Sequence, residues 1–126
     1  METISEHAAF GGKVGFYRHA SSVNHCDMQF SVFTPAAAKK RPVPVLTWLA
    51  GLTCTEETFM IKAGAQRVAD ELGLMLVCPD TSPRGDDVPD DPQQAYDFGL
   101  GAGFYLNATQ TPWSRHYHMY DYLTRE

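Results

Sequence analysis

Residues 43–50 read VPVLTWLA, a nearly continuous apolar run that stops at Gly51. A second apolar run, LMLVC at residues 74–78, stops at Pro79-Asp80. Strands that are buried on both faces of a parallel sheet have this composition, because helices cover both sides. We therefore predict that both runs are buried strands of a parallel sheet.

A helix is predicted between these two strands. Its apolar residues recur at i, i+3, i+4 and i+7, the spacing of one buried helix face: Ala65, Val68, Ala69 and Leu72. Gly73 follows them, where a helix commonly ends with a left-handed residue. A strand, a helix and a strand with short connections form a βαβ unit, whose strands run parallel with a right-handed crossover.

Two more strands are predicted before this unit, at residues 12–20 (GKVGFYRHA) and 26–34 (CDMQFSVFT). The residues between them favour a turn: Ser21, Ser22 and Asn24. The second strand alternates with a period of two, which predicts one solvated face. The two alternating sets are Met28, Phe30, Val32 and Thr34 on one face and Asp27, Gln29, Ser31 and Phe33 on the other. An antiparallel start followed by a βαβ unit indicates an α/β fold.

The segment from Asp80 to about Gln110 is predicted to be a long loop. Loops of that length are usually functional or disordered, and the glycines and aromatic residues of DFGLGAGFY (97–105) favour an ordered, packed one. A last helix is predicted to begin with Thr111 as its N-cap and Pro112 as its first residue. One face of this helix would carry four large side chains: Trp113, Tyr117, Tyr120 and Leu123.

The length and composition of the chain indicate one globular domain, residues 1–126. Hydrophobic residues make up 44% of the chain and charged residues 20%, as in ordinary folded domains. The formal net charge of −5 argues against a strongly basic nucleic-acid binder. No run approaches the roughly 18 apolar residues of a membrane span, and METISEHAAF at the start lacks the positive charge of a signal peptide. We therefore expect neither a nucleic-acid nor a membrane partner.

The cysteine and histidine spacing does not favour a metal site. Cys26, Cys54 and Cys78 are odd in number and widely spaced, with no CxxC pair. That pattern fits the reduced thiols of a cytoplasmic protein better than a disulfide framework. His116 and His118 stand two apart in the last predicted helix, where such positions do not share a face. No metal is expected.

The segment GLTCTEE (51–57) leaves the C-terminal end of a predicted buried strand, and ligands bind outside that edge in open α/β sheets. Thr53 and Glu56 have the spacing of a capping box, so a helix is expected to begin here. The free N–H groups of its first turn would favour a developing negative charge. An ordinary turn between strand and helix fits the same residues, and spacing alone leaves both interpretations open.

No sequence motif identifies a nucleophile. Cys54 fits a thiol activated by a helix N-terminus, but no His has an identifiable place beside it as a base, so a buried or pocket-lining thiol is the alternative. No Ser lies in a G-x-S-x-G elbow. GLGAG (99–103) is not a dinucleotide-binding motif, and there is no Walker A sequence.

Five long segments carry a family resemblance: WLAGLTCTEETF (48–59), KAGAQRVADELGL (62–74), PDTSPRGDD (79–87), YDFGLGAGFYLNATQTPW (96–113) and HYHMYDYL (116–123). In this order they resemble the S-formylglutathione hydrolase family, also called esterase D. The resemblance implies an α/β-hydrolase fold and a Ser-His-Asp triad that needs no metal or organic cofactor. It also implies hydrolysis of S-formylglutathione to glutathione and formate, a step of formaldehyde detoxification, and of small carboxylic esters.

Members of that family are longer than this chain, and Ala50 stands where they usually have Ser. The resemblance implies that the triad lies beyond Glu126, so residues 1–126 are expected to be one incomplete domain that is inactive alone. An incomplete parallel sheet exposes an edge, which predicts a homo-oligomer. A non-catalytic module that binds thiol compounds or pairs with another chain is the alternative function.

The resemblance also assigns roles to residues. In α/β-hydrolases one oxyanion donor comes from the loop after the third strand, which makes the backbone N–H of Leu52 the expected donor. Gly51, Thr53 and Cys54 are expected at the edge of the pocket. Three further residues are expected on the acyl or glutathione side, with plain structural packing as the alternative: Gly103, Phe104 and Trp113.

Overall fold

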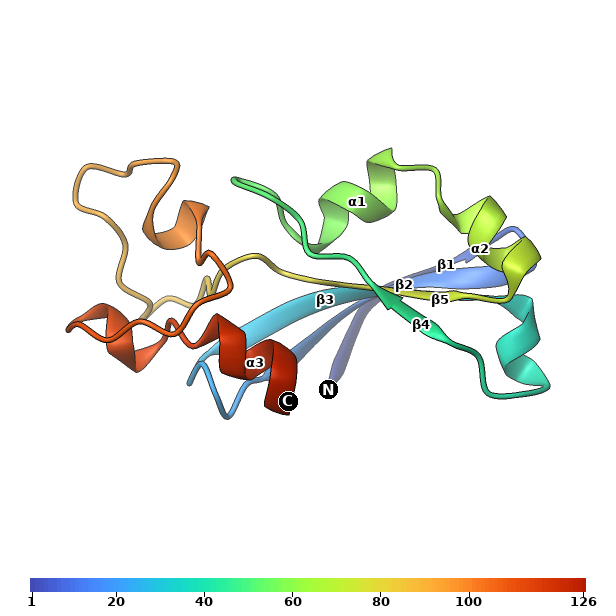
Figure 1. The fold of residues 1–126 in the computed structure, drawn as a ribbon, viewed down its shortest axis with the longest axis horizontal. Helices are drawn as coiled ribbons and strands as arrows, with labels where there is room; N and C mark the ends of the chain where they lie inside the picture. Colours follow the sequence, from blue (N-terminus) through green and yellow to red (C-terminus); the bar gives the residue numbers. More distant parts are fainter.

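Five strands form a single mixed sheet in the computed structural model, which describes residues 1–126 (Figure 1). They are β1 (Glu2–Ala9), β2 (Gly12–Ala20), β3 (Asp27–Thr34), β4 (Val45–Thr47) and β5 (Met75–Pro79). Their order across the sheet is β1-β2-β3-β5-β4. The pairs β1–β2, β2–β3 and β3–β5 are antiparallel, whereas β4 and β5 pair parallel. The predicted α/β class is confirmed.

Helices lie on both faces of this sheet. α1 (Glu56–Lys62) and α2 (Gln66–Leu72) cover one face, and α3 (Met119–Arg125) lies on the other (Figure 1). Three short 3-10 turns complete the chain: η1 (Ala36–Lys39), η2 (Gly99–Gly101) and η3 (Trp113–Arg115). Residues 80–98 contain no helix or strand, so the long loop predicted after Asp80 is confirmed.

The two strands predicted near the N-terminus are confirmed as β2 and β3, but the solvated face assigned to β3 is wrong. Phe33 and Ser31 are fully buried, because α1 and α2 pack on their face. Met28, on the opposite face, is also buried. The alternation was therefore real, but helices cover both faces of the strand. β1 was not predicted, since its sequence ETISEHAA is largely exposed and carries little apolar pattern.

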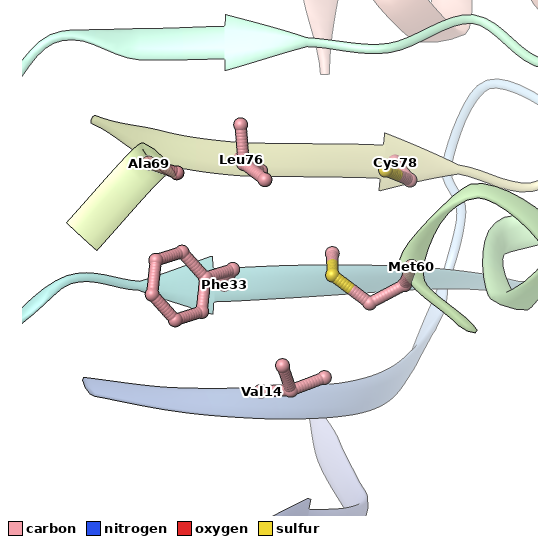
Figure 2. Close-up of a cluster of buried hydrophobic side chains, with 6 residues drawn as sticks. All are labelled: Val14, Phe33, Met60, Ala69, Leu76 and Cys78. Atoms are coloured by element: carbon pink, nitrogen blue, oxygen red, sulfur yellow. The ribbon is translucent and has the colours of Figure 1, made fainter. Parts of the chain in front are cut away.

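A compact cluster forms the main core between the sheet and the first two helices (Figure 2). Val14, Phe33, Leu76 and Cys78 project from three strands, and Met60 of α1 and Ala69 of α2 close over them: the six side chains are drawn together in Figure 2. A fully buried Phe contributes roughly 1.5–3 kcal/mol relative to an exposed one. Phe33, at 0% exposure, is the largest side chain of this cluster.

A second, smaller cluster attaches α3 to the other face. Met28 of β3 packs against Met119 and Tyr122 of α3. The Tyr122 hydroxyl lies 3.0 Å from His19 Nε2 on β2, and the two rings stack 5.7 Å apart. This contact explains why the last helix is held against the N-terminal strands although it lies about a hundred residues away in sequence.

The run at residues 43–50 forms a shorter and more exposed strand than predicted. Its parallel pairing with β5 is confirmed, through Leu46 opposite Leu76 and Thr47 opposite Val77. Only Val45–Thr47 is strand, and Val45 and Leu46 are 56% and 48% exposed. The prediction of burial on both faces is wrong for β4, because it is the edge strand and pairs only with β5.

The single helix predicted between β4 and β5 is two helices. Gly64, with φ of +62°, separates α1 from α2. Val68 and Leu72 are 48% and 64% exposed, and Ala69 is the one buried residue of α2, so the predicted apolar face is wrong. Gly73 has φ of +68°, which confirms the left-handed cap.

Both predicted helix starts are displaced along the chain. The capping box uses Thr55 and Thr58 rather than Thr53 and Glu56: Thr58 Oγ1 accepts from Thr55 N at 3.1 Å, and Thr55 Oγ1 accepts from Glu57 N at 3.3 Å. Thr53 instead has φ of +60°, which places it in the preceding turn. Two threonines inside TCTEET carry the reciprocal bonds that the spacing had assigned to Thr and Glu.

The last helix begins at Met119 rather than near Thr111. Pro112 precedes the separate turn η3, and its peptide bond with Thr111 is cis. The predicted face of four large residues is wrong, because Trp113 lies outside the helix and Tyr120 is 56% exposed. The buried residues of α3 are Met119 and Tyr122. No helix has the length and hydrophobicity that a membrane crossing requires.

The isolated 126-residue chain is expected to self-associate or to fold only in part. β4 has an unpaired edge, and Trp48 and Leu49 beside it are exposed. Burial of apolar surface contributes about 25 cal/mol per Å², so association that covers these side chains is favoured. Size-exclusion chromatography with light scattering at micromolar concentration measures this. A monodisperse monomer that melts cooperatively above about 55 °C, inside the mesophile range, would contradict the expectation.

Candidate functional site

Two loops that leave the parallel strands β4 and β5 meet in a cleft of about 240 Å³. Both loops follow C-terminal strand ends, the edge at which open α/β sheets bind ligands. The third wall comes from the segment after η2. The lining residues are Ala50, Gly51, Leu52, Thr81, Ala102, Gly103, Phe104 and Tyr105.

Residues 50–54 turn sharply after β4 and are held mainly by groups outside the turn. The N–H of Thr53 donates to Gly101 O at 3.0 Å, and the Tyr105 hydroxyl donates to Ala50 O at 2.8 Å. Within the turn, the Cys54 N–H donates to Gly51 O at 3.2 Å. The backbone N–H of Leu52 donates to no protein group. An unused backbone donor beside a cleft is a group that a bound oxyanion could satisfy.

The wall opposite this turn has a crowded backbone. A Cβ at Gly103 would lie 2.9 Å from Thr81 O and 3.0 Å from Met119 Cγ, so glycine is the residue that fits there. Phe104 and Tyr105 follow, each with φ of +52°. Left-handed backbone at a non-glycine residue costs on the order of 1–3 kcal/mol and clusters at functional sites. The fold therefore holds these two aromatic residues in a fixed, uncommon conformation at the cleft.

A second hollow of about 330 Å³ adjoins the first and shares Ala102, Gly103 and Phe104 with it. Trp113 lies in this second hollow. Its ring meets Phe98 edge-to-face at 4.7 Å and Tyr117 at 5.5 Å. The lining combines apolar side chains with Asn107, Thr109 and Gln110, so the hollow can contact both the apolar and the polar portions of a flexible ligand.

Burial controls the protonation of the groups beneath the cleft. It raises the pKa of Tyr105 to about 12, so this hydroxyl remains a donor to Ala50 O at neutral pH. Burial also raises the pKa of Asp80, while the adjacent Arg84 guanidinium opposes that rise. The pKa of Glu56 is raised by its burial and by the nearby charge of Asp80.

The structure brings four of the expected site residues into the first cleft: Gly51, Leu52, Gly103 and Phe104. Thr53 and Cys54 lie in the same turn but do not line the cleft, and Trp113 lies only in the adjoining hollow. Four lining residues were not predicted from the sequence: Ala50, Thr81, Ala102 and Tyr105. Ala50 is in WLAGLTCTEETF, Thr81 is in PDTSPRGDD, and Ala102 and Tyr105 are in DFGLGAGFY, so motif position was the one signal that could have indicated them.

No group of three or more His, Cys, Asp and Glu side chains has an arrangement that could hold a metal ion. The cleft itself offers backbone donors, one tyrosine hydroxyl, one threonine hydroxyl and apolar walls. Such a set can orient a carbonyl compound and stabilise an oxyanion. It contains no Ser or His to act as nucleophile and base.

Comparison with known proteins gives a family match over most of the chain. Residues 21–126 match the Esterase family model, described as "Putative esterase". An S-formylglutathione hydrolase from Agrobacterium tumefaciens superposes with a TM-score of 0.96 at 50% sequence identity, over 99% of this chain. This chain spans 45% of the length of that hydrolase.

More distant solved structures share the fold. The fluorophosphonate-binding serine hydrolase F of Staphylococcus aureus has a TM-score of 0.56 at 18% identity, over 90% of this chain and 38% of its own. A ferulic acid esterase has a TM-score of 0.53 at 23% identity, over 60% of this chain and 33% of its own. At these identities the likeness concerns the arrangement of the backbone.

Cys78 is expected to resist alkylation in the folded protein. It is buried in the core, and burial raises its pKa to about 11. The reactive thiolate therefore forms only as the pH rises toward that value, so at pH 8 the group is protonated. Mass spectrometry after N-ethylmaleimide treatment should find Cys78 unmodified while the half-buried Cys54 is labelled. Labelling of both at equal rates would contradict this, and a urea-denatured sample is the control.

Proposed function

Because this chain belongs to the esterase family and has its α/β-hydrolase fold, we propose that it forms the oxyanion-hole and pocket-wall portion of an S-formylglutathione hydrolase. The substrate is a thioester, S-formylglutathione, and the products are glutathione and formate. The reaction belongs to glutathione-dependent formaldehyde detoxification. The 50% identity with the Agrobacterium hydrolase along almost the whole chain supports this substrate class.

The observation that carries the proposal is the unused N–H of Leu52 at the mouth of the cleft. When a serine oxygen attacks the thioester carbonyl, the carbonyl oxygen becomes an oxyanion. A backbone N–H that donates to that oxygen stabilises the transition state, and loss of one such donor costs about 2.7–4 kcal/mol in a known hydrolase. Collapse of the intermediate then expels the glutathione thiolate, which takes up the proton removed from the serine, and water hydrolyses the remaining formyl-serine ester to formate.

The nucleophile, its base and the second N–H donor belong to polypeptide that these 126 residues do not contain. No G-x-S-x-G elbow is present, and in this fold the second donor is the N–H that follows the nucleophile. We therefore infer that Gly51, Leu52, Thr53 and Cys54 contribute the oxyanion turn. The wall formed by Gly103 and Phe104, with Trp113 in the adjoining hollow, receives the acyl or glutathione portion of the substrate.

Two further inferences accompany this function. Three widely spaced cysteines without a CxxC pair support a reducing, cytoplasmic location. The exposed edge of β4 supports association with another copy of the chain, and it also favours the second candidate function, a pairing module without turnover. Hydrolysis by the complete protein would exclude that second candidate.

The 126-residue chain by itself is expected to show no triad-type esterase activity. The measurement is p-nitrophenyl acetate hydrolysis by the purified chain and by its Cys54→Ala variant, each against buffer alone. Activity that disappears in Cys54→Ala and after iodoacetamide would instead indicate a thiol nucleophile. Turnover well above background that survives the Cys54 change would contradict the assignment of the triad to other polypeptide.

In the complete protein, Leu52→Pro is expected to lower kcat by on the order of 10²–10³-fold, because proline has no N–H to donate. Leu52→Ala keeps the N–H and is expected to lower kcat/KM only modestly through the shape of the pocket. Circular dichroism of both variants controls for folding. A folded Leu52→Pro enzyme with near-normal kcat would mean that another group is the donor.

A further inference from the structure

Resting on the proposed function, we infer that Arg84, held by Asp80, is a positioning residue that sets the direction of the Leu52 N–H through Cys54. Arg84 lies in the loop after β5 and does not line the cleft. Its effect on the oxyanion donor is therefore indirect, and it passes from Asp80 through Arg84 and Cys54 to the Gly51–Leu52 peptide.

The first contact fixes the guanidinium. Arg84 Nε lies 2.9 Å and 3.1 Å from the two carboxylate oxygens of Asp80. The Asp80 side chain is 4% exposed, and its backbone N–H donates to Gln29 O on β3 at 3.0 Å. An ion pair with one nearly buried partner is screened less by salt than a surface pair. The hydrogen bond to β3 therefore fixes Asp80 to the sheet, and Asp80 in turn fixes the Arg84 guanidinium.

The second contact carries that position to the turn. Arg84 Nη2 donates to Cys54 O at 3.2 Å, and Thr81 Oγ1 donates to the same carbonyl oxygen at 2.5 Å. Arg84 Nη2 also lies 3.3 Å from Thr81 Oγ1. One carbonyl at the end of the 51–54 turn is thus held by two donors from the β5 side. These two bonds locate Cys54 relative to the sheet.

The last contacts transmit the position to the donor itself. The Cys54 N–H donates to Gly51 O at 3.2 Å. That oxygen belongs to the same peptide group as the Leu52 N–H, and a peptide group is planar. A bond that fixes the direction of the Gly51 carbonyl therefore fixes the direction of the Leu52 N–H, which points the opposite way within the same plane.

Few other groups could fix the orientation of the Gly51–Leu52 peptide group. Gly51 has no neighbour within 4 Å of the Cβ position, and Leu52 is 46% exposed, so packing constrains the peptide group weakly. Tyr105 holds Ala50 and Gly101 holds Thr53, but neither bond engages the Gly51–Leu52 peptide. The Cys54 bond is the one that does, and Arg84 and Thr81 hold Cys54.

The test uses the complete protein and p-nitrophenyl acetate as the probe substrate. Arg84→Ala is expected to lower kcat roughly 10–100-fold while KM changes less than about threefold, because a misplaced donor costs transition-state stabilisation rather than substrate binding. Added guanidinium at millimolar concentration is expected to restore part of kcat. Arg67→Ala is the matched control, since Arg67 is exposed on α2 and has no ion pair.

A double-mutant cycle separates positioning from general structural support. In a Leu52→Pro background the donor is already absent, so adding Arg84→Ala should lower kcat no further. An equal loss in both backgrounds would overturn the inference. If Arg84→Ala does not fold by circular dichroism, Thr81→Val, which removes the second donor to Cys54, replaces it with the same expected direction and the same cycle.

The remaining outcomes distinguish the two proposals. An active parent whose folded Arg84→Ala and Thr81→Val variants keep kcat overturns the positioning role and leaves the proposed function standing. A folded parent that hydrolyses neither S-formylglutathione nor p-nitrophenyl acetate overturns the proposed function, and the positioning role with it.

Discussion

The pairing of β5 with both β3 and β4 is the constraint on which the rest of the structure depends. It joins an antiparallel half of the sheet to a parallel half. The parallel register places Thr47 opposite Val77 and is extended by the Trp48 N–H, which donates to Val77 O at 2.8 Å. Because both strands then end at the same edge, the turn at residues 50–54 and the loop that begins at Asp80 must lie side by side.

The cleft follows from that juxtaposition and from an unusual backbone opposite it. Gly103 lets the chain approach Thr81 closely, and Phe104 and Tyr105 hold left-handed conformations. Loops carry binding groups most accurately when a rigid scaffold fixes them. Here Tyr105, Gly101 and Arg84 each bond to a different point of the 50–54 turn, so the turn is rigid without being part of a helix or strand.

The same topology explains where apolar surface is left exposed. β4 is paired on one side only, and Val45, Leu46 and Trp48 are about half exposed. A buried parallel strand needs a neighbour and helical cover. The composition of residues 43–50 therefore fits the interior of a larger sheet, which agrees with a chain that spans 45% of the Agrobacterium hydrolase.

The sequence by itself determined the local features. Period-two alternation located β3, the apolar run at 74–78 located β5, and Gly73 located the end of α2, because each signal depends on residues adjacent in the chain. Tertiary structure decided what depends on neighbours far along the chain. The face of β3 that carries Phe33 is buried by helices that come later in the chain. The break at Gly64 divides the predicted helix in two, and β4 is the edge strand of the sheet. The hold of Arg84 on Cys54 spans thirty residues, and periodicity contains no information about hydrogen bonds between side chains and backbone at that separation.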